Sequence, residues 1–198
     1  MARSSALAQS LTLEEWADLE EDVPGELVDG RIEEEEVPTP LHEAVTAWLL
    51  WALQSWVVPL GGVAFGSELK LVVTKRRGRK ADVSMYLPGR PLPARGVGAT
   101  RRPPSVVVEI VSPSPRDIRR DVVDKKREYA SFRVSYYWIV DPRARTFEVL
   151  ELAADGRFTV ALTAAEGAHP VPGCDGLVID LDALWKSADL LPESEDEG

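Results

Sequence analysis

The stretch SVVVEIV, residues 105–111, is apolar almost throughout, and a single acid, Glu109, interrupts it. A near-continuous apolar run of this length is typical of a central strand that is covered on both faces. A carboxylate in such a strand is costly to bury unless it is paired, hydrogen-bonded or bound to a metal. The sequence therefore predicts a central strand with one acid whose charge must be compensated.

A helix is predicted downstream, over residues 121–132. Asp121, Lys125 and Tyr129 are spaced i, i+4 and i+8, so they share one helix face, which can direct Lys125 back towards Glu109. One interpretation is a structural salt bridge between Glu109 and Lys125. The other is a phosphodiesterase site, in which acids hold a divalent cation and a lysine orients water.

Upstream, residues 81–87 (ADVSMYL) are predicted as a strand that begins with a second acid, Asp82. Residues 63–73 (VAFGSELKLVV) are predicted as strand material, and residues 74–80 (TKRRGRK) as a basic loop between this segment and the strand at 81–87. The ExK pattern at Glu68–Lys70 puts both charges on one strand face, and we interpret it as a surface ion pair.

The N-terminal part contains two local signals. Asp29-Gly30 lies between Leu27-Val28 and Arg31-Ile32 and predicts a β-hairpin, because a type I′ turn needs positive φ at both central residues. Thr39 and Pro40 fit the N-cap and first position of a helix that reaches Val58. We expect its core stripe at Val45, Leu49, Ala52 and Trp56. Trp48 and Trp51 lie off this stripe and predict a homodimer interface.

Charge is distributed unevenly along the 198 residues. The net charge is −10, yet residues 70–102 contain 10 basic and 1 acidic side chains. Such a segment favours local docking of a polyanion, and a solvated basic loop without a partner is the alternative. The predicted nucleic-acid contacts are Lys75, Arg76, Arg77, Arg79 and Lys80.

Several classes of protein are disfavoured. A single cysteine, Cys174, rules out an intrachain disulfide framework, and two histidines form no zinc-binding pattern. The first residues lack the apolar core of a signal peptide. The apolar helix at 44–58 would span only about 22 Å, less than the roughly 30 Å of a hydrocarbon core. We expect a cytoplasmic protein with no membrane partner and an unreactive Cys174.

Strands outnumber helices and the two are interspersed. This pattern predicts an α/β (α+β) fold, in which a mixed sheet is flanked by helices and preceded by an N-terminal β-hairpin. The length favours one domain over residues 1–188. The acidic end, residues 189–198, is predicted to be a disordered tail.

Five segments together resemble, in their order and spacing, the Uma-two family of restriction-endonuclease-like proteins. They are ELVDGRI (26–32), PTPLHEAV (38–45), ADVSMY (81–86), VVVEIVSPS (106–114) and DVVDKKREYASFRVSYYWIVDP (121–142). The resemblance covers about Glu26 to Leu152. It implies the fold of the PD-(D/E)xK nucleases, in which metal-binding acids lie on adjacent central strands of a mixed sheet.

The resemblance also implies roles for single residues. Asp82 matches the aspartate of the PD motif and Glu109 the acid of the ExK strand. The usual lysine position is Val111, and the resemblance implies that Lys125 replaces that lysine in space.

The chain departs from the family pattern at two positions. Ala81 stands where the family has proline, and Tyr136 stands for the glutamate of a segment usually written GVxEYW. The second change is expected to weaken a contact that supports the site.

The function expected is that of a Mg²⁺- or Mn²⁺-dependent endonuclease that hydrolyses DNA phosphodiester bonds. Its metal ligands would be Asp82, Glu109 and the carbonyl of Ile110, while Lys125 would position water and stabilise charge. Accessory roles are expected for Glu26, His42, Asp121 and Tyr129. The alternatives are an inactive nucleic-acid- or protein-binding module on the same fold, and an enzyme that hydrolyses a small phosphate ester.

Overall fold

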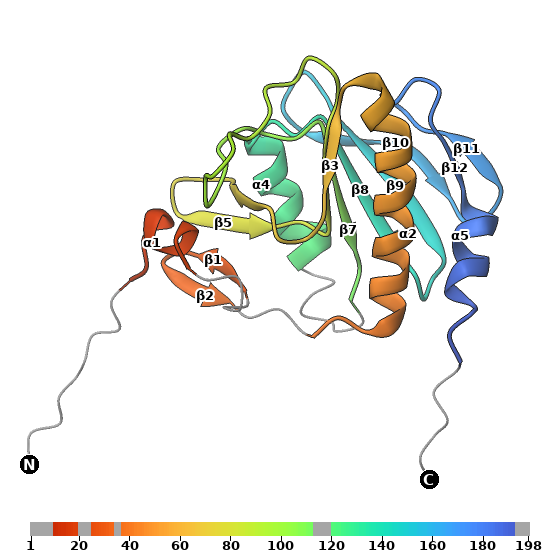
Figure 1. Cartoon of the computed structure of the whole chain (residues 1–198), viewed down its shortest axis with the longest axis horizontal. Coiled ribbons are helices and arrows are strands. Elements are labelled where there is room, and N and C mark those ends of the chain that lie inside the picture. Colours follow the sequence, from red (N-terminus) through yellow and green to blue (C-terminus); the bar gives the residue numbers. More distant parts are fainter. Residues whose placement is uncertain (1–9, 20–24, 34–36, 113–119, 193–198) are drawn as a thin grey trace, which may run out of the picture.

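The computed structural model of the chain describes residues 10–19, 25–33, 37–112 and 120–192. Its main feature is a six-stranded sheet in the order β10-β9-β8-β7-β6-β3 (Figure 1). Neighbouring strands are antiparallel except for β7 and β8, which are parallel. The strands are β3 (Val63–Phe65), β6 (Val83–Tyr86), β7 (Val106–Ile110), β8 (Tyr136–Asp141), β9 (Thr146–Leu152) and β10 (Phe158–Ala164).

A second, four-stranded sheet has the order β2-β1-β5-β4. Its strands are β1 (Glu26–Val28), β2 (Arg31–Glu33), β4 (Lys70–Val72) and β5 (Arg77–Lys80). The predicted hairpin forms its edge, with φ of 50° at Asp29 and 86° at Gly30, as a type I′ turn requires. The mixed six-stranded sheet, the flanking helices and the N-terminal hairpin confirm the predicted fold class.

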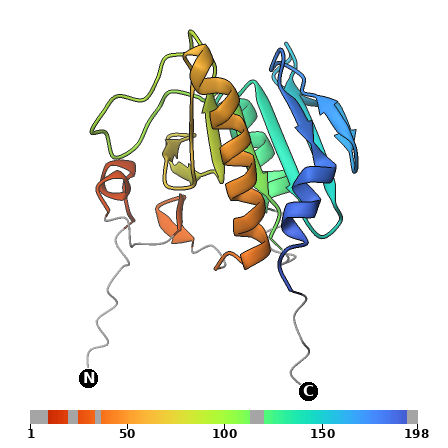
Figure 2. The same cartoon turned by 45° about the vertical axis from the view of Figure 1, so that its right-hand side comes forward.

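Helices cover both faces of the six-stranded sheet. The long α2 (Pro40–Val57) and α5 (Leu181–Ala188) lie side by side on one face (Figure 2). On the other face lie η2 (Arg120–Lys125), a wider π-helical turn, and α4 (Lys126–Ser131), close to β5 (Figure 1). The remaining elements are α1 (Leu13–Ala17), the 3₁₀ turn η1 (Val58–Leu60) and the hairpin of β11 (Ala168–Pro170) and β12 (Val178–Asp180).

Strand β7 divides the interior into two cores. Val106, Val108 and Ile110 face α2 and α5, whereas Val107 packs with Tyr129 of α4 on the opposite face. Because side chains alternate along a strand, Glu109 lies on the α4 face with Val107. The predicted central strand is confirmed, and all five of its residues are buried.

The strand material predicted at 63–73 forms two strands, β3 and β4, that belong to different sheets. Two details of the sequence interpretation are wrong. The predicted basic loop contains β5, whose Arg79 and Lys80 are buried. The Glu68–Lys70 ion pair is also replaced: Glu68 pairs with Lys80, and Lys70 donates to carbonyls at the end of α1.

The N-cap of α2 at Thr39 and its Pro40 start are confirmed. Its fully buried stripe is rotated from the expected one and consists of Val45, Leu49, Leu53 and Val57. No described helix has the length and apolar composition needed to cross a membrane. The predicted tail, 189–198, lies outside the described residues except for 189–192.

Candidate active site

Asp82 and Glu109 lie at the same end of the paired strands β6 and β7. The antiparallel register pairs Val83 with Val108, so Asp82 directly precedes, and Glu109 directly follows, the last paired residues. Asp82 stands just before β6 begins, so its carboxylate lies at the end of the strand pair and keeps 16% of its side-chain surface exposed.

Glu109 is compensated from α4 and the turn before it. Its Oε2 lies 2.9 Å from Nζ of Lys125, and its Oε1 accepts a 2.6 Å hydrogen bond from the hydroxyl of Tyr129. Burial, and then the charge of Glu109, hold the pKa of Tyr129 well above its ordinary value, so the hydroxyl stays protonated and donates. The helix face that was predicted to hold Lys125 and Tyr129 therefore contacts Glu109, the acid predicted in the central strand.

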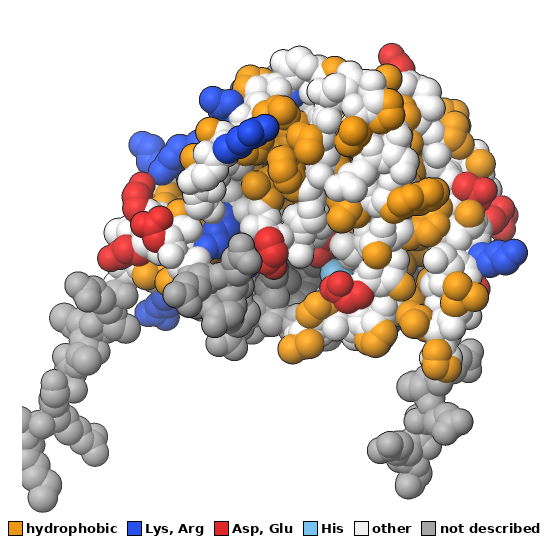
Figure 3. Space-filling model, viewed as in Figure 1, with side chains coloured by type: hydrophobic (Ala, Val, Ile, Leu, Met, Phe, Trp, Pro, Cys, Tyr) orange, Lys and Arg blue, Asp and Glu red, His pale blue; other side chains and the backbone are white. Residues whose placement is uncertain are grey.

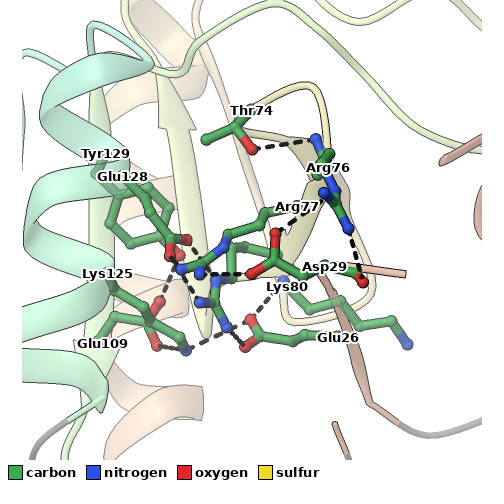
Figure 4. Close-up of polar contacts among 11 residues, drawn as sticks. Glu26, Asp29, Thr74, Arg76, Arg77, Lys80, Glu109, Lys125, Glu128 and Tyr129 are labelled. Atoms are coloured by element: carbon green, nitrogen blue, oxygen red, sulfur yellow. Dashed lines mark hydrogen bonds and ion pairs between the residues drawn. The ribbon is translucent and has the colours of Figure 1, made fainter. Parts of the chain in front are cut away.

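Lys125 is shared between two acids. Its Nζ is also 3.5 Å from Oε1 of Glu26, and both side chains are about 99% buried. Glu26 accepts a second bond from the backbone N–H of Lys80 at 2.9 Å. Glu26, in the first strand of the hairpin, thus places its carboxylate beside Lys125 at the end of η2, as Figure 4 shows.

Arg79 fixes this arrangement from β5. It donates to Glu26 at 2.7 Å and forms a two-pronged pair with Glu128 at 2.6 and 2.9 Å. Burial lowers the pKa of Arg79, but the two carboxylates outweigh burial and raise it, so the side chain is permanently charged. Arg77 also contacts Glu128 and pairs with Asp29 at 2.8 Å. Each charged side chain of this cluster therefore contacts at least one group of opposite charge.

Asp82 has a separate set of partners at the end of β7. Its Oδ2 accepts the backbone N–H of Ile110 at 2.7 Å, and its Oδ1 lies 3.4 Å from Nε2 of His42 in α2. Burial lowers the pKa of His42, but the hydrogen bond and charge of Asp82, the charge of Glu43 and the backbone of Ile110 raise it overall. His42 therefore belongs with Asp82 and Ile110 at one site.

The donor atoms suit a hard divalent cation. Asp82 and Glu109 have carboxylate oxygens at the same end of two neighbouring strands, and Ile110, directly after Glu109, has a backbone carbonyl. Within the described ranges, no group of three or more His, Cys, Asp or Glu side chains is arranged as a metal site. Two carboxylates suffice for Mg²⁺, which keeps several waters and binds substrate phosphate as well.

The sequence itself decides the family. Residues 9–183 match the Uma2 family, which is described as "Putative restriction endonuclease". The chain belongs to the Uma2 family. The Uma2 chain is also similar to a solved structure described as that of "a putative nuclease belonging to DUF820 from Anabaena variabilis". The identity is 22% and the TM-score 0.72, over 90% of this chain and 99% of that chain, which indicates a shared fold. A comparison with curated proteins gave no match.

The basic residues of this Uma2 chain separate into two groups. Lys75 and Arg76 are exposed, and Arg101 and Arg102 add to the positive charge of this side. Figure 3 shows Lys and Arg side chains gathered on the left, where the small sheet lies. Arg79 and Lys80 are buried in ion pairs, and Arg77 is partly buried and paired with Asp29 and Glu128, so the most accessible of the predicted phosphate contacts are Lys75 and Arg76.

The departures from the family pattern do not alter the candidate ligands. Ala81 is fully buried and adds no charge. Tyr136 packs with the core on the α2 face and donates to Glu151 at 3.2 Å, so it points away from the face of Glu109. The side chain of Asp121, expected as accessory, lies outside the described ones.

The sequence interpretation missed the roles of Glu128 and Arg79. Glu128 is three residues after Lys125 and therefore on a neighbouring part of the same helix surface, which is a usable signal. Arg79 offered none, because nothing in TKRRGRK distinguishes one arginine from the next.

Proposed function

We propose that this Uma2 chain is a divalent-metal-dependent endonuclease that hydrolyses phosphodiester bonds of DNA. The observation that supports this most directly is Lys125 held 2.9 Å from Glu109, while Asp82 lies next to the last residue pair of the same two strands, Val83 and Val108. Two acids on adjacent strands and a lysine from the next helix are the parts that phosphodiester hydrolysis by a bound cation needs.

The residues would divide the work as follows. A cation held by Asp82, Glu109 and the carbonyl of Ile110 would polarise the phosphate and lower the pKa of bound water. Lys125 would orient the attacking water with its ammonium group and stabilise negative charge on the phosphate. Tyr129 and the N–H of Ile110 would hold the two carboxylates in place.

The substrate would be held by exposed cations. Lys75, Arg76, Arg101 and Arg102 are the candidates on the basic side of the molecule. Each phosphate that these residues neutralise would release about one counterion, so binding would weaken steeply with salt. The buried Arg79 would have no part in this dependence.

The decisive experiment is nicking of supercoiled plasmid with Mg²⁺ or Mn²⁺. The full chain is expected to cleave, and Asp82→Asn to lower the rate at least ~100-fold, because a metal ligand is lost. Its matched control is Asp155→Asn in the exposed turn between β9 and β10, which should cleave normally. Since Asp82 loses only its charge and can still accept from Ile110, we expect its melting temperature to remain within a few degrees of wild type.

Each alternative predicts a different outcome. An inactive binding module would bind plasmid DNA and not cut it with either metal. A small-ester hydrolase would act on a chromogenic phosphodiester and leave DNA intact. Wild-type cleavage by Asp82→Asn would refute the proposed ligand set.

We also propose that two copies associate through the outer face of α2, which would supply two sites for the two strands of a duplex. Trp51 is 65% exposed, next to Val58 at 54% and Leu60 at 52%. Trp48 contacts the Trp51 ring with centroids 6.5 Å apart. Apolar side chains exposed together are typical of interfaces. Sedimentation of a monomer at micromolar concentration, unchanged by Trp51→Glu, would contradict this assembly.

A further inference from the structure

A cavity of about 420 Å³ lies where α1 meets the small sheet, two parts that are side by side in Figure 1. Four segments line it: the start of α1 with the residues before it, the hairpin of β1 and β2, the turn between β4 and β5, and the loop before β7. None of the candidate active-site residues is among them. Its volume is within the roughly 300–1,000 Å³ that is typical of small-molecule sites.

The floor of this cavity is apolar and held in place by contacts within the protein. Leu13 of α1 and Leu27 of β1 line it, and both pack with Trp16 in a small core of their own. The backbone N–H of Leu11 donates to the carbonyl of Gly30 at 2.9 Å, which ties the segment before α1 to the hairpin turn. The cavity is therefore formed before any ligand enters it.

The rim of the cavity is positive. Lys75, Arg76 and Arg101 line it together with one acid, Glu14, so the lining carries a net charge of +2. Lys75 is exposed and makes no ion pair within the part of the chain that the structure describes. Arg101 and Glu14 are 3.2 Å apart, but their side chains are 62% and 75% exposed, and such a pair holds its partners only weakly.

Arg76 also keeps capacity for an anion. Its Nε lies 3.7 Å from Asp29, whereas Nη2 of Arg77 lies 2.8 Å from the same carboxylate. Asp29 is therefore shared and compensates Arg76 only in part. An anion in the cavity could contact three cations that have no strong partner of their own.

We propose that this cavity binds a nucleotide through a terminal phosphate monoester, which belongs to a free nucleoside monophosphate or to the phosphorylated end of a DNA strand. A phosphate monoester carries a charge of about −1.5 to −2 at pH 7, which matches the rim, and it offers three acceptor oxygens to the cations. The sugar and base would cover the leucines of the floor. The choice of a nucleotide among phosphate monoesters rests on the proposed function.

The first test is calorimetric titration of the full chain, without metal, with deoxyadenosine 5′-monophosphate, deoxyadenosine and inorganic phosphate. We expect the monophosphate to bind at least ~10-fold more tightly than either part, because it alone contacts both floor and rim. Lys75→Gln should weaken its binding at least ~5-fold, since a charged donor is lost. The matched control is Lys186→Gln, an exposed lysine of α5, which should bind normally. Binding no tighter than that of phosphate, or equal losses in both variants, would overturn the proposal.

The second test distinguishes the two sources of the phosphate. Fluorescence anisotropy, again without metal, compares duplexes of one sequence with 5′-phosphate or 5′-hydroxyl ends. Binding of the phosphorylated duplex at least ~5-fold more tightly, with the preference lost in Lys75→Gln, would assign the cavity to DNA ends. Equal binding of the duplexes beside tight binding of the monophosphate would assign it to a free nucleotide.

Failure of this inference and failure of the proposed function give different results. A circular plasmid has no strand ends, so its cleavage does not depend on the cavity being an end-binding site. A chain that cleaves plasmid but prefers neither the monophosphate nor the phosphorylated duplex would refute the inference and leave the proposed function intact. A chain that binds the monophosphate through Lys75 and cleaves nothing would support the inference and refute the proposed function.

Discussion

Replacing Lys125 with methionine measures how much the buried ion pairs of Lys125 with Glu109 and Glu26 contribute to the free energy of unfolding. Met preserves most of the volume of the side chain and removes the ammonium group. Nζ lies 2.9 Å from Glu109 and 3.5 Å from Glu26, and Lys125 is only 1% exposed. Two buried carboxylates would therefore lose their shared cation, although Glu26 keeps Arg79 and Glu109 keeps Tyr129.

The expected cost follows from that burial. Removing one partner of a buried ion pair destabilises proteins by about 3–5 kcal/mol, because the remaining buried charge loses its counter-ion. For a chain of 198 residues the entropy of unfolding is about 0.4 kcal/mol/K, so the melting temperature should fall by about 7–12 °C. Lys126→Met, one residue along on a partly exposed side chain, should change it by about 1 °C.

The assay is thermal unfolding followed by circular dichroism, with a second variant that also removes the negative charge. Lys125→Met/Glu109→Gln should recover at least half of the loss, because a neutral amide can still accept from Tyr129. A Lys125→Met protein that melts within 2 °C of wild type would refute the reasoning. So would a double variant no more stable than the single one, since the penalty would then not arise from the stranded carboxylate.

Three further predictions concern other parts of the chain. Arg79→Met should lower the free energy of unfolding, measured in urea, by about 3–5 kcal/mol, because two buried carboxylates lose their partner. Arg76→Met should change it by less than ~0.5 kcal/mol, because that side chain is exposed. Equal effects would contradict the separation of the basic residues into buried and exposed ones. Arg133 has a φ of 67° directly after α4, so Arg133→Gly should stabilise the protein by about 1 kcal/mol, and a loss would contradict this. Burial raises the pKa of Cys174 to about 12, so the native thiol should resist iodoacetamide at pH 8. Because the unfolded thiol ionises first, this group should lower stability as the pH rises above ~9, and Cys174→Ala should reduce that pH dependence.

The sequence was most informative where local chemistry determines local structure. Asp29-Gly30 and Thr39-Pro40 specify a turn and a helix start through their own backbone preferences. The apolar run around Glu109 required a buried strand, and the i, i+4, i+8 spacing brought Lys125 and Tyr129 to it. These predictions needed no knowledge of distant partners.

The sequence was least informative where burial depends on pairing across the chain. Strand β5 reads RGRK, which has no apolar residue, and it is buried because Glu26 and Glu128 neutralise Arg79. Periodicity measures hydrophobicity and cannot detect such a strand. Helix α5 was missed for another reason, because its Asp180 cap and apolar spacing are present in the sequence and were not used.

The buried charge cluster also sets an order of events during synthesis. Glu26 leaves the ribosome first, Arg79 about 50 residues later and Lys125 about 100 residues later. At roughly 5–20 residues per second, the hairpin waits about 5–20 s for its last cation. Until Lys125 is made, Glu26 can pair only with Arg79 of its own sheet, and the ion pairs that join this sheet to the helix cannot form. The small sheet is therefore a late addition to the folding chain, although its first strands are made early.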